Sequence, residues 1–151
     1  GLKNSEHKIV GINSRLDSLN AFVLNEKLKI FDNISKTRND FYKYYVDNLS
    51  DCNFIKLPKK ENSNILLNYF TISINKNLRN KLMDYLKING ISTSIYYKTP
   101  VHQLPALSFM KKSFKLDKTV NASETVLSLP LYPFAKKSEM ERVVKKILNF
   151  S

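Results

Sequence analysis

Apolar residues recur at helical spacing through the first third of the chain, and neither Gly nor Pro interrupts residues 12–57. This spacing predicts a long helix from Leu16 to Leu49. Ser14 and Asp17 form an S-x-x-D capping box at its start, where each side chain can satisfy a free backbone N–H. A continuous helix of this length would measure about 50 Å, so we expect a break, a bend or support from outside the chain. The recurring positions are Leu16, Leu19, Val23, Phe31, Ile34, Tyr45 and Leu49.

Strand and helix patterns alternate through the rest of the chain. Residues 68–74 alternate between apolar and polar, which predicts a strand, and a helix capped by Asn77 and ended by Gly90 follows. Residues 91–97 and 126–129 predict two more strands, separated by a proline-framed loop. A last helix follows a second capping box, Ser138 with Glu141. The apolar positions expected on buried faces are Phe70, Ile72 and Ile74, then Leu78, Leu82, Tyr85 and Leu86, then Val143, Val144, Ile147 and Leu148.

Together these elements predict the α+β class. A small sheet of three or four strands would be covered by helices on one face and preceded by one long helix. Residues 1–50 would form a leading loop and the long helix, and residues 51–151 a small α+β domain. A chain of 151 residues suffices for one ordinary domain. If the second face of the sheet were apolar and uncovered, it would be an interaction surface.

The chain carries a formal net charge of +12, which would suit nucleic acid, an anionic membrane or a phosphorylated ligand. However, 21 of the 25 basic residues are Lys, and the chain is also rich in Asn and Ile. All three have A/T-rich codons, so base composition alone can explain the excess, and dedicated nucleic-acid binders favour Arg. We therefore do not expect a nucleic-acid partner, although a basic nucleic-acid-binding domain stays an alternative. No apolar run approaches the roughly 20 residues that span a bilayer.

Few residues carry obvious chemistry. One cysteine and two histidines are a poor set of metal ligands, so we expect no metal site. Cys52 follows a predicted helix C-terminus and a carboxylate, and both raise a thiol pKa and disfavour a nucleophile. His102, in the proline-framed loop, is the better acid–base candidate. At the predicted start of the first helix, Asn13 and Arg15 add donors to free backbone N–H groups, which suits a phosphate. The alternative is that Ser14 merely caps the helix and Arg15 points into water.

Six segments resemble, in order, the motifs of the DegT/StrS-type sugar aminotransferases, which have the aspartate-aminotransferase fold. They extend over nearly the whole chain, so the chain is identified as a member of this family. The segments are residues 11–28 with G-x-N-x-R-L, Arg38 with Tyr45, residues 69–72 of the central strand, residues 79–93 with R-x-x-L-x-x-x-L and G-I-x-T, residues 97–102 with Y-x-x-P-x-H, and residues 127–133 with L-S-L-P-x-x-P.

The resemblance implies a pyridoxal-phosphate (PLP) enzyme that transfers an amino group, usually from L-glutamate, to a keto group on a sugar nucleotide. It implies a role in cell-surface polysaccharide or amino-sugar biosynthesis and a cytoplasmic homodimer with active sites between subunits. The chain corresponds to the C-terminal portion and lacks the large domain, which carries the Schiff-base lysine. We therefore expect no catalytic residue in this chain, and neither bound PLP nor activity from the chain alone.

The resemblance also assigns roles to four residues. Asn13 and Arg15 match positions that hold the PLP phosphate of the neighbouring subunit. Tyr97 and His102 match a loop near the sugar nucleotide, where a phenol and an imidazole can donate to phosphates or sugar hydroxyls. The long first helix would link the large and small domains and contribute to the dimer. The alternative function is a stand-alone binding or assembly module that docks through the first helix and the exposed sheet face.

Overall fold

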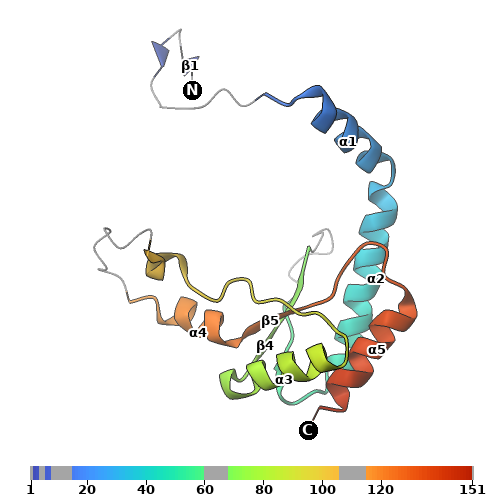
Figure 1. Cartoon of the computed structure of the whole chain (residues 1–151), viewed down its shortest axis with the longest axis vertical. Helices are drawn as coiled ribbons and strands as arrows, with labels where there is room; N and C mark the ends of the chain where they lie inside the picture. Colours follow the sequence, from blue (N-terminus) through green and yellow to red (C-terminus); the bar gives the residue numbers. More distant parts are fainter. Residues whose placement is uncertain (1, 4–5, 8–14, 60–67, 106–114, 151) are drawn as a thin grey trace. The chain divides into compact units, whose positions relative to one another are not determined.

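The computed structural model divides into two compact units, residues 1–33 and residues 34–151 (Figure 1). The first unit holds a pair of two-residue strands, β1 (Leu2–Lys3) and antiparallel β2 (Glu6–His7), where the sequence predicted a loop. It also holds helix α1. The second unit holds a three-stranded sheet and its helices. The residues that the structure describes are 2–3, 6–7, 15–59, 68–105 and 115–150.

Helix α1 (Ser18–Lys29) begins later than the sequence predicted. Asp17 is its N-cap, since the carboxylate accepts a hydrogen bond from the Asn20 N–H at 2.9 Å. The prediction that Ser14 caps this helix is therefore wrong, and Ser14 itself lies outside the described residues. Both Ser and Asp are favoured at N-caps, so the pattern of residue types alone does not separate them.

The long helix predicted from Leu16 to Leu49 is interrupted at Ile30. Helix α1 ends at Lys29, and helix α2 (Phe31–Leu49) follows directly. Ile30 leaves the helical conformation, with a ψ of 3°, and its N–H donates to the carbonyl of Lys27 at 3.3 Å. The break expected from the length of the helix is thus confirmed, at a position that neither Gly nor Pro marks.

The second unit is built on an antiparallel sheet in the order β3–β4–β5. Strand β4 (Phe70–Ile74) lies in the centre, between β3 (Ile55–Lys56) and β5 (Val126–Leu129). Strands β4 and β5 confirm two of the predicted strands, whereas the strand predicted over residues 91–97 is wrong. Within that segment only Ser94 bridges to β5, through two backbone hydrogen bonds of 2.7 and 3.1 Å. The chain then leaves the sheet edge.

Three further helices belong to this unit: α3 (Lys76–Ile88), α4 (Asp117–Thr125) and α5 (Lys137–Leu148). The sequence predicted α3 and α5 because each carries apolar residues at regular helical spacing. Helix α4 was not predicted, because it offers few apolar positions and has no side-chain cap. It directly precedes β5, and its residues had been assigned to the end of the predicted loop.

Both helix starts predicted in this unit lie two residues too late. Asn75 rather than Asn77 caps α3, since the Asn75 side-chain oxygen accepts from the Asn77 N–H at 3.0 Å. Helix α5 begins after Lys136, whose N–H donates to the Glu139 carboxylate at 2.7 Å, so Ser138 is not the cap. In both helices the prediction placed the N-cap at a residue of a favoured cap type that instead lies inside the first helical turn.

The end of α3 agrees with the prediction that Gly90 stops it. Gly90 has a φ of +71°, and the Ile91 N–H donates back to the Leu86 carbonyl at 2.8 Å, as in a Schellman motif. Arg142 of α5 donates from Nη2 to the Asn89 carbonyl at 2.5 Å and so satisfies one of the last acceptors of α3. A side chain therefore ties α5 to this helix end.

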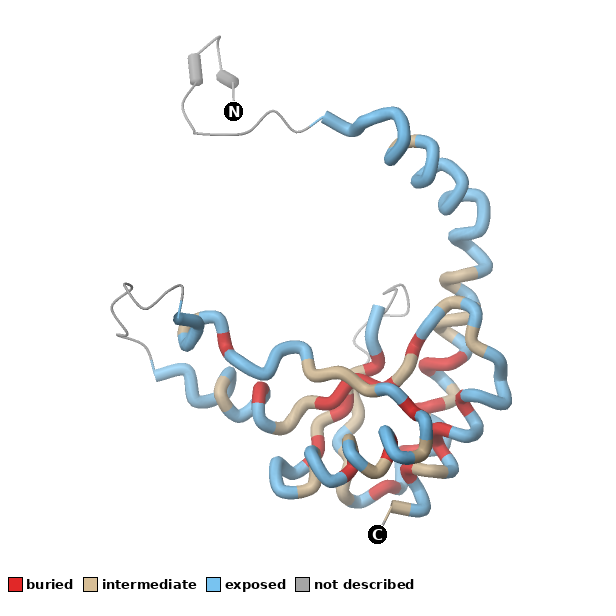
Figure 2. The backbone as a smooth tube through the Cα atoms, in the orientation of Figure 1, coloured by how far each residue is buried: buried red, intermediate tan, exposed pale blue. Residues whose placement is uncertain are grey.

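One hydrophobic core holds the second unit together, and it includes residues of α2, α3, α5, β4 and β5 (Figure 2). Tyr45 is fully buried, and its ring lies 4.8 Å from that of Phe70. Leu148, predicted to be buried, is 52% exposed, while Met140 on the same helix is buried. The core includes Phe41, Tyr42, Tyr45, Leu49, Phe70, Ile72, Ile74, Leu82, Leu86, Leu127, Leu129, Met140, Val143, Val144 and Ile147.

The opposite face of the sheet is mostly polar, with Val126 of β5 opposite Ser73 as an apolar exception. Thr71 of β4 pairs with Ser128 of β5, and their hydroxyl oxygens lie 2.8 Å apart. Ser73 alternates onto the same face. An interaction surface was expected on this face only if the face were apolar. Its polar pairs do not support such a surface.

Candidate functional site

Two predicted site residues, Tyr97 and His102, lie in the segment that follows the Ser94 bridge. Tyr97 is 74% exposed. His102 is half-buried and lies in a short 3₁₀-helix, η1 (Val101–Gln103). The Gln103 N–H donates to the Pro100 carbonyl at 2.9 Å and closes the turn. The prolines and this turn fix the backbone that carries the imidazole.

Three tyrosine rings, which we call the tyrosine array, lie beside this segment: Tyr69, Tyr96 and Tyr97. The rings of Tyr69 and Tyr96 are 4.3 Å apart and tilted by 38°, and those of Tyr96 and Tyr97 are 5.7 Å apart in an edge arrangement. A hydrogen bond with Tyr96 raises the pKa of the Tyr69 phenol, while the charge of Arg38 acts in the opposite direction. The array joins the start of β4 to the loop.

Arg38 connects α2 to the residues that enter β4. Its Nη1 donates to the side-chain oxygen of Asn68 at 2.9 Å, and Asn68 immediately precedes Tyr69. Arg38 matches the family pattern, but no role was predicted for it from the sequence. The contact shows that it helps to hold the base of the tyrosine array.

A pocket of about 220 Å³ lies beside Tyr96 and Tyr97. One side is formed by loop residues, and helix α4 with the start of β5 forms the other; the loop residues are Tyr96, Tyr97, Thr99, Pro100 and Val101. His102 is not among the lining residues, so the structure brings Tyr97 to this pocket without its predicted companion. The residues on the second side are Thr119, Ala122, Ser123 and Val126.

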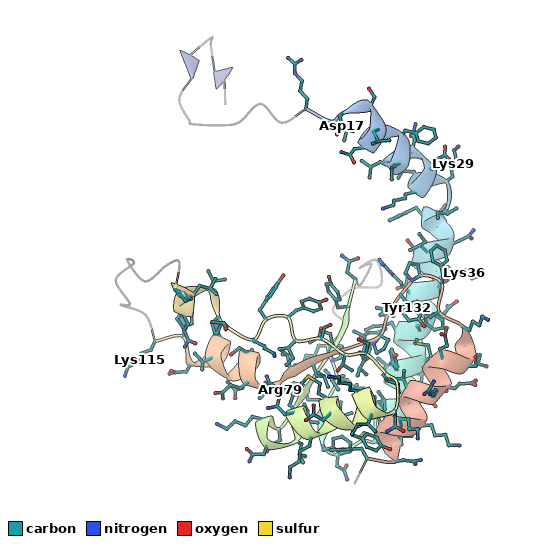
Figure 3. All side chains as sticks on the ribbon, viewed as in Figure 1. Asp17, Lys29, Lys36, Arg79, Lys115 and Tyr132 are labelled. Carbon is teal, nitrogen blue, oxygen red and sulfur yellow. The ribbon has the colours of Figure 1, made fainter. Side chains whose placement is uncertain are left out.

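Helix α4, which supplies one wall of the pocket, is anchored to α3. Arg79 of α3 donates from Nη1 to the Ser123 carbonyl at 2.6 Å (Figure 3). The Ser123 hydroxyl is itself engaged, since it donates to the Val120 carbonyl at 2.7 Å. An exposed ion pair, Lys76 with Glu124 at 3.6 Å, adds little to stability. The hydrogen bond from the half-buried Arg79 therefore fixes the position of this wall.

The predicted phosphate-binding residues belong to the first unit. Asn13 lies outside the described residues, and Arg15 is exposed. The Asn20 N–H, followed by the Asn20 side chain, lowers the pKa of the Asp17 carboxyl by hydrogen bonding. A charged carboxylate thus already occupies the positive end of α1. This negative charge opposes an anion at the helix end, whereas the exposed Arg15 provides positive charge next to it.

Cys52 is buried, and burial raises the pKa of its thiol, which agrees with the prediction of an unreactive cysteine. The cause is burial rather than the neighbouring carboxylate. Among the residues that the structure describes, no three His, Cys, Asp or Glu side chains gather to hold a metal ion. None of the described helices is both long and apolar enough to cross a membrane.

Comparison with known proteins decides the family. Residues 1–148 match the DegT/DnrJ/EryC1/StrS aminotransferase family. The chain belongs to this family. It is 31% identical over 150 residues to the dTDP-3-amino-3,6-dideoxy-alpha-D-galactopyranose transaminase of Aneurinibacillus thermoaerophilus, which covers 98% of this chain and 40% of that protein. It is 30% identical over 148 residues to the pleiotropic regulatory protein of Geobacillus stearothermophilus, covering 95% and 39%.

Solved structures show the same fold. DesV of S. venezuelae, in complex with a ketimine intermediate, superposes with a TM-score of 0.83 and 28% identity over 96% of this chain and 39% of that one. NtdA of Bacillus subtilis, with bound cofactor PMP, gives a TM-score of 0.82 and 25% identity over 97% and 35%. The predicted α+β, fold-type-I architecture is thereby confirmed. The chain spans about 40% of the length of the curated relatives that it matches.

Sequence reasoning missed part of the candidate site. Tyr96 precedes Tyr97 in the sequence, and this adjacency was a signal that the loop presents more than one aromatic ring. The contact of Tyr69 with Tyr96 has no local signal, because tertiary structure alone brings β4 to the loop. Likewise, the pocket depends on α4, which the sequence did not predict.

Proposed function

We propose that this chain is the C-terminal portion of a PLP-dependent aminotransferase that transfers an amino group from L-glutamate to a keto group on a sugar nucleotide. The match of residues 1–148 to the aminotransferase family carries the proposal. The printed names of several relatives, which are dTDP- and UDP-sugar transaminases, support the substrate class. The reaction would serve cell-surface polysaccharide or amino-sugar biosynthesis in the cytoplasm.

Asn13 and Arg15 would hold the PLP phosphate of the neighbouring subunit. The exposed guanidinium of Arg15 fits this role, because its fork of N–H donors matches phosphate oxygens. The Asp17 carboxylate two residues later opposes an anion, so Arg15 would supply the positive charge that the start of α1 does not. When bound, PLP supplies the electron sink for amino-group transfer.

Tyr97 and His102 would bind the sugar nucleotide. The Tyr97 phenol is accessible, and it can donate to a phosphate or a sugar hydroxyl. The imidazole of His102, on the turn that follows Pro100, can donate to the same part of the ligand. Both would contact the substrate from one loop.

The first helical region would link the large and small domains and contribute to a homodimer, with residues 1–50 as the linking part and residues 51–151 as the small domain. The apolar residues of α1 support this, because none of them is buried. The same observation supports the alternative of a stand-alone assembly module. The exposed apolar residues of α1 are Leu19, Phe22, Val23, Leu24 and Leu28, and those beside it are Leu16, Ile30 and Phe31.

The test compares the complete enzyme that contains this chain with the 151-residue chain alone. We expect glutamate-dependent amination of a nucleotide-linked keto sugar by the enzyme and none by the chain. In the enzyme, Arg15→Ala should weaken PLP retention about tenfold, the effect of losing a charge-assisted hydrogen bond, measured by PLP absorbance after dialysis. Lys29→Ala, which removes another exposed cation of the same unit, is the control and should change nothing. Amination by the pure chain would overturn the proposal.

A further inference from the structure

Another cavity, which we call the amide groove, lies where β4 ends and α3 begins. Its volume is about 740 Å³, and β3 and α4 complete its walls. The tyrosine array stands at the other end of β4, about 13 Å away along the strand. The groove shares no lining residue with the pocket beside the array. Four asparagines line it: Asn53, Asn75, Asn77 and Asn121.

Three of these asparagines have side-chain amides without a hydrogen-bond partner among the residues that the structure describes. They are Asn53, Asn77 and Asn121, whereas the Asn75 oxygen accepts from the Asn77 N–H at 3.0 Å. Each amide offers one acceptor and two donors. All three are exposed and therefore hydrated, so a ligand that displaces this water must bring donors and acceptors of its own. The groove thus disfavours an apolar ligand.

The charge of the lining is positive. Its described residues include Lys56 and Lys76 but no Asp or Glu. Lys76 is partly neutralised by Glu124, whose carboxylate lies 3.6 Å from its ammonium. Lys56 is exposed and has no ion pair within the described part of the chain. One free ammonium is a compact point charge, which suits a single carboxylate better than a polyphosphate.

Aliphatic side chains form the rest of the lining. Ile74 is buried, and Ile55 and Leu78 are half-buried, so they can pack against the C–H face of a sugar ring. Phe54 is the one aromatic residue of the described lining, and its ring already contacts that of Phe150 at 5.7 Å. It leaves little free face for a nucleotide base. The volume lies within the roughly 300–1,000 Å³ of small-molecule sites and far exceeds the size of one ion.

We propose that the amide groove binds an acidic saccharide, with a carboxylate at Lys56 and neighbouring hydroxyls on the amides of Asn77 and Asn121. A pair of hydroxyls can donate to an amide oxygen and accept from an amide nitrogen at the same time. A bare phosphate would use Lys56 and leave the amides and most of the volume without partners. This binding site goes beyond the proposed function and does not depend on it.

The test measures dissociation constants by calorimetry with the complete enzyme that contains this chain. The probes are the hyaluronan disaccharide, which joins glucuronate to N-acetylglucosamine, its neutral counterpart N-acetyllactosamine, and inorganic phosphate. The hyaluronan disaccharide should bind about tenfold more tightly than either of the others. N-acetyllactosamine lacks the charge-assisted contact with Lys56, and phosphate lacks the contacts with the amides.

Two substitutions at exposed positions test the assigned contacts. Lys56→Gln should weaken the disaccharide about tenfold, and Asn77→Ala about fivefold. Asn77→Ala keeps the backbone N–H that Asn75 accepts, so the start of α3 is preserved. The matched controls should bind as the wild type, since they remove an exposed lysine and an exposed asparagine outside the groove. They are Lys81→Gln and Asn149→Ala.

Tyr97→Ala locates the ligand, because it alters the predicted sugar-nucleotide loop and leaves the groove intact. It should not change the affinity for the hyaluronan disaccharide. A loss of affinity in this variant would overturn the inference, as would unchanged affinity in both Lys56→Gln and Asn77→Ala.

The wild-type enzyme gives a further decision. No binding of the hyaluronan disaccharide, or equal binding of N-acetyllactosamine or phosphate, refutes an acidic-saccharide site. Turnover is scored separately. An enzyme that aminates no nucleotide-linked sugar refutes the proposed function, while the dissociation constants still report on the groove.

Discussion

At the scale of single residues, Tyr45 shows how a polar atom is accommodated in the core. Its side chain is fully buried, and its hydroxyl donates to the Pro130 carbonyl at 2.8 Å, just beyond the end of β5. Burial raises the pKa of this phenol, so it stays a neutral donor. One hydrogen bond thereby links α2 to the segment that leaves the sheet.

Replacing this tyrosine tests the link. Tyr45→Phe keeps the ring on Phe70 but leaves the Pro130 carbonyl without the donor, which should lower the free energy of unfolding by about 1–2 kcal/mol. Urea denaturation measures the change. Tyr97→Phe removes a hydroxyl from a largely exposed side chain and should stay within about 0.5 kcal/mol of the wild type. Equal effects of the two substitutions would contradict this account.

At the scale of elements, the first turn of α5 depends on the charge of Glu139. Its carboxylate accepts from the Lys136 N–H at 2.7 Å and interacts with the Tyr132 hydroxyl. The backbone hydrogen bond, followed by the one from Tyr132, lowers the pKa of Glu139 below its ordinary value. A lowered pKa in the folded state means that the stabilisation is present above the unfolded pKa and lost as the pH falls through the folded one.

We therefore expect the start of α5 to loosen in acid. The carboxyl of Glu139 should titrate by NMR with a midpoint below the ordinary value of about 4.3, and the Lys136 amide signal should follow the same curve. Tyr132→Phe should raise the midpoint, because it removes one donor. In Glu139→Gln the Lys136 amide should lose this pH dependence. A midpoint at or above the ordinary glutamate pKa would count against the assigned hydrogen bonds.

The elements that the sequence predicted best are those with regular apolar spacing and a marked end. Helix α3 is periodic and stops at Gly90, and β5 ends at Pro130. Their boundaries were less certain, because Ser, Asn and Asp can all serve as N-caps. The strand predicted over residues 91–97 failed for a different reason. A strand needs several successive residues paired along a sheet edge, and within this segment only Ser94 meets β5.

The candidate site was predictable to the extent that it lies in one segment. Tyr97 and His102 came from a single loop motif, whereas the pocket joins that loop to an unpredicted helix and the array joins it to β4. Contacts between segments distant in sequence depend on how the helices and strands pack. A local sequence pattern therefore predicted the loop, but it could not predict which residues from other segments contact it.

At the scale of the whole molecule, the two units differ in what holds them. Helix α1 has no buried residue, while α2 carries four. Helices of fewer than about 12–15 residues are marginal in water without packing. In the isolated chain, trypsin should therefore cut after Lys27 and Lys29 at least about tenfold faster than after Lys43, which is exposed on the packed helix α2. Mass spectrometry of the digest follows the sites. Preferential cutting after Lys43 would contradict this difference.

The uncovered apolar residues of α1 also set the temperature dependence of any assembly in which they take part. Covering them removes apolar surface from water, and that change carries a negative heat capacity. The enthalpy of association would then become more favourable with each degree of warming, while the entropic gain shrinks. The heat-capacity change of association therefore measures how much of the apolar surface of α1 a partner covers.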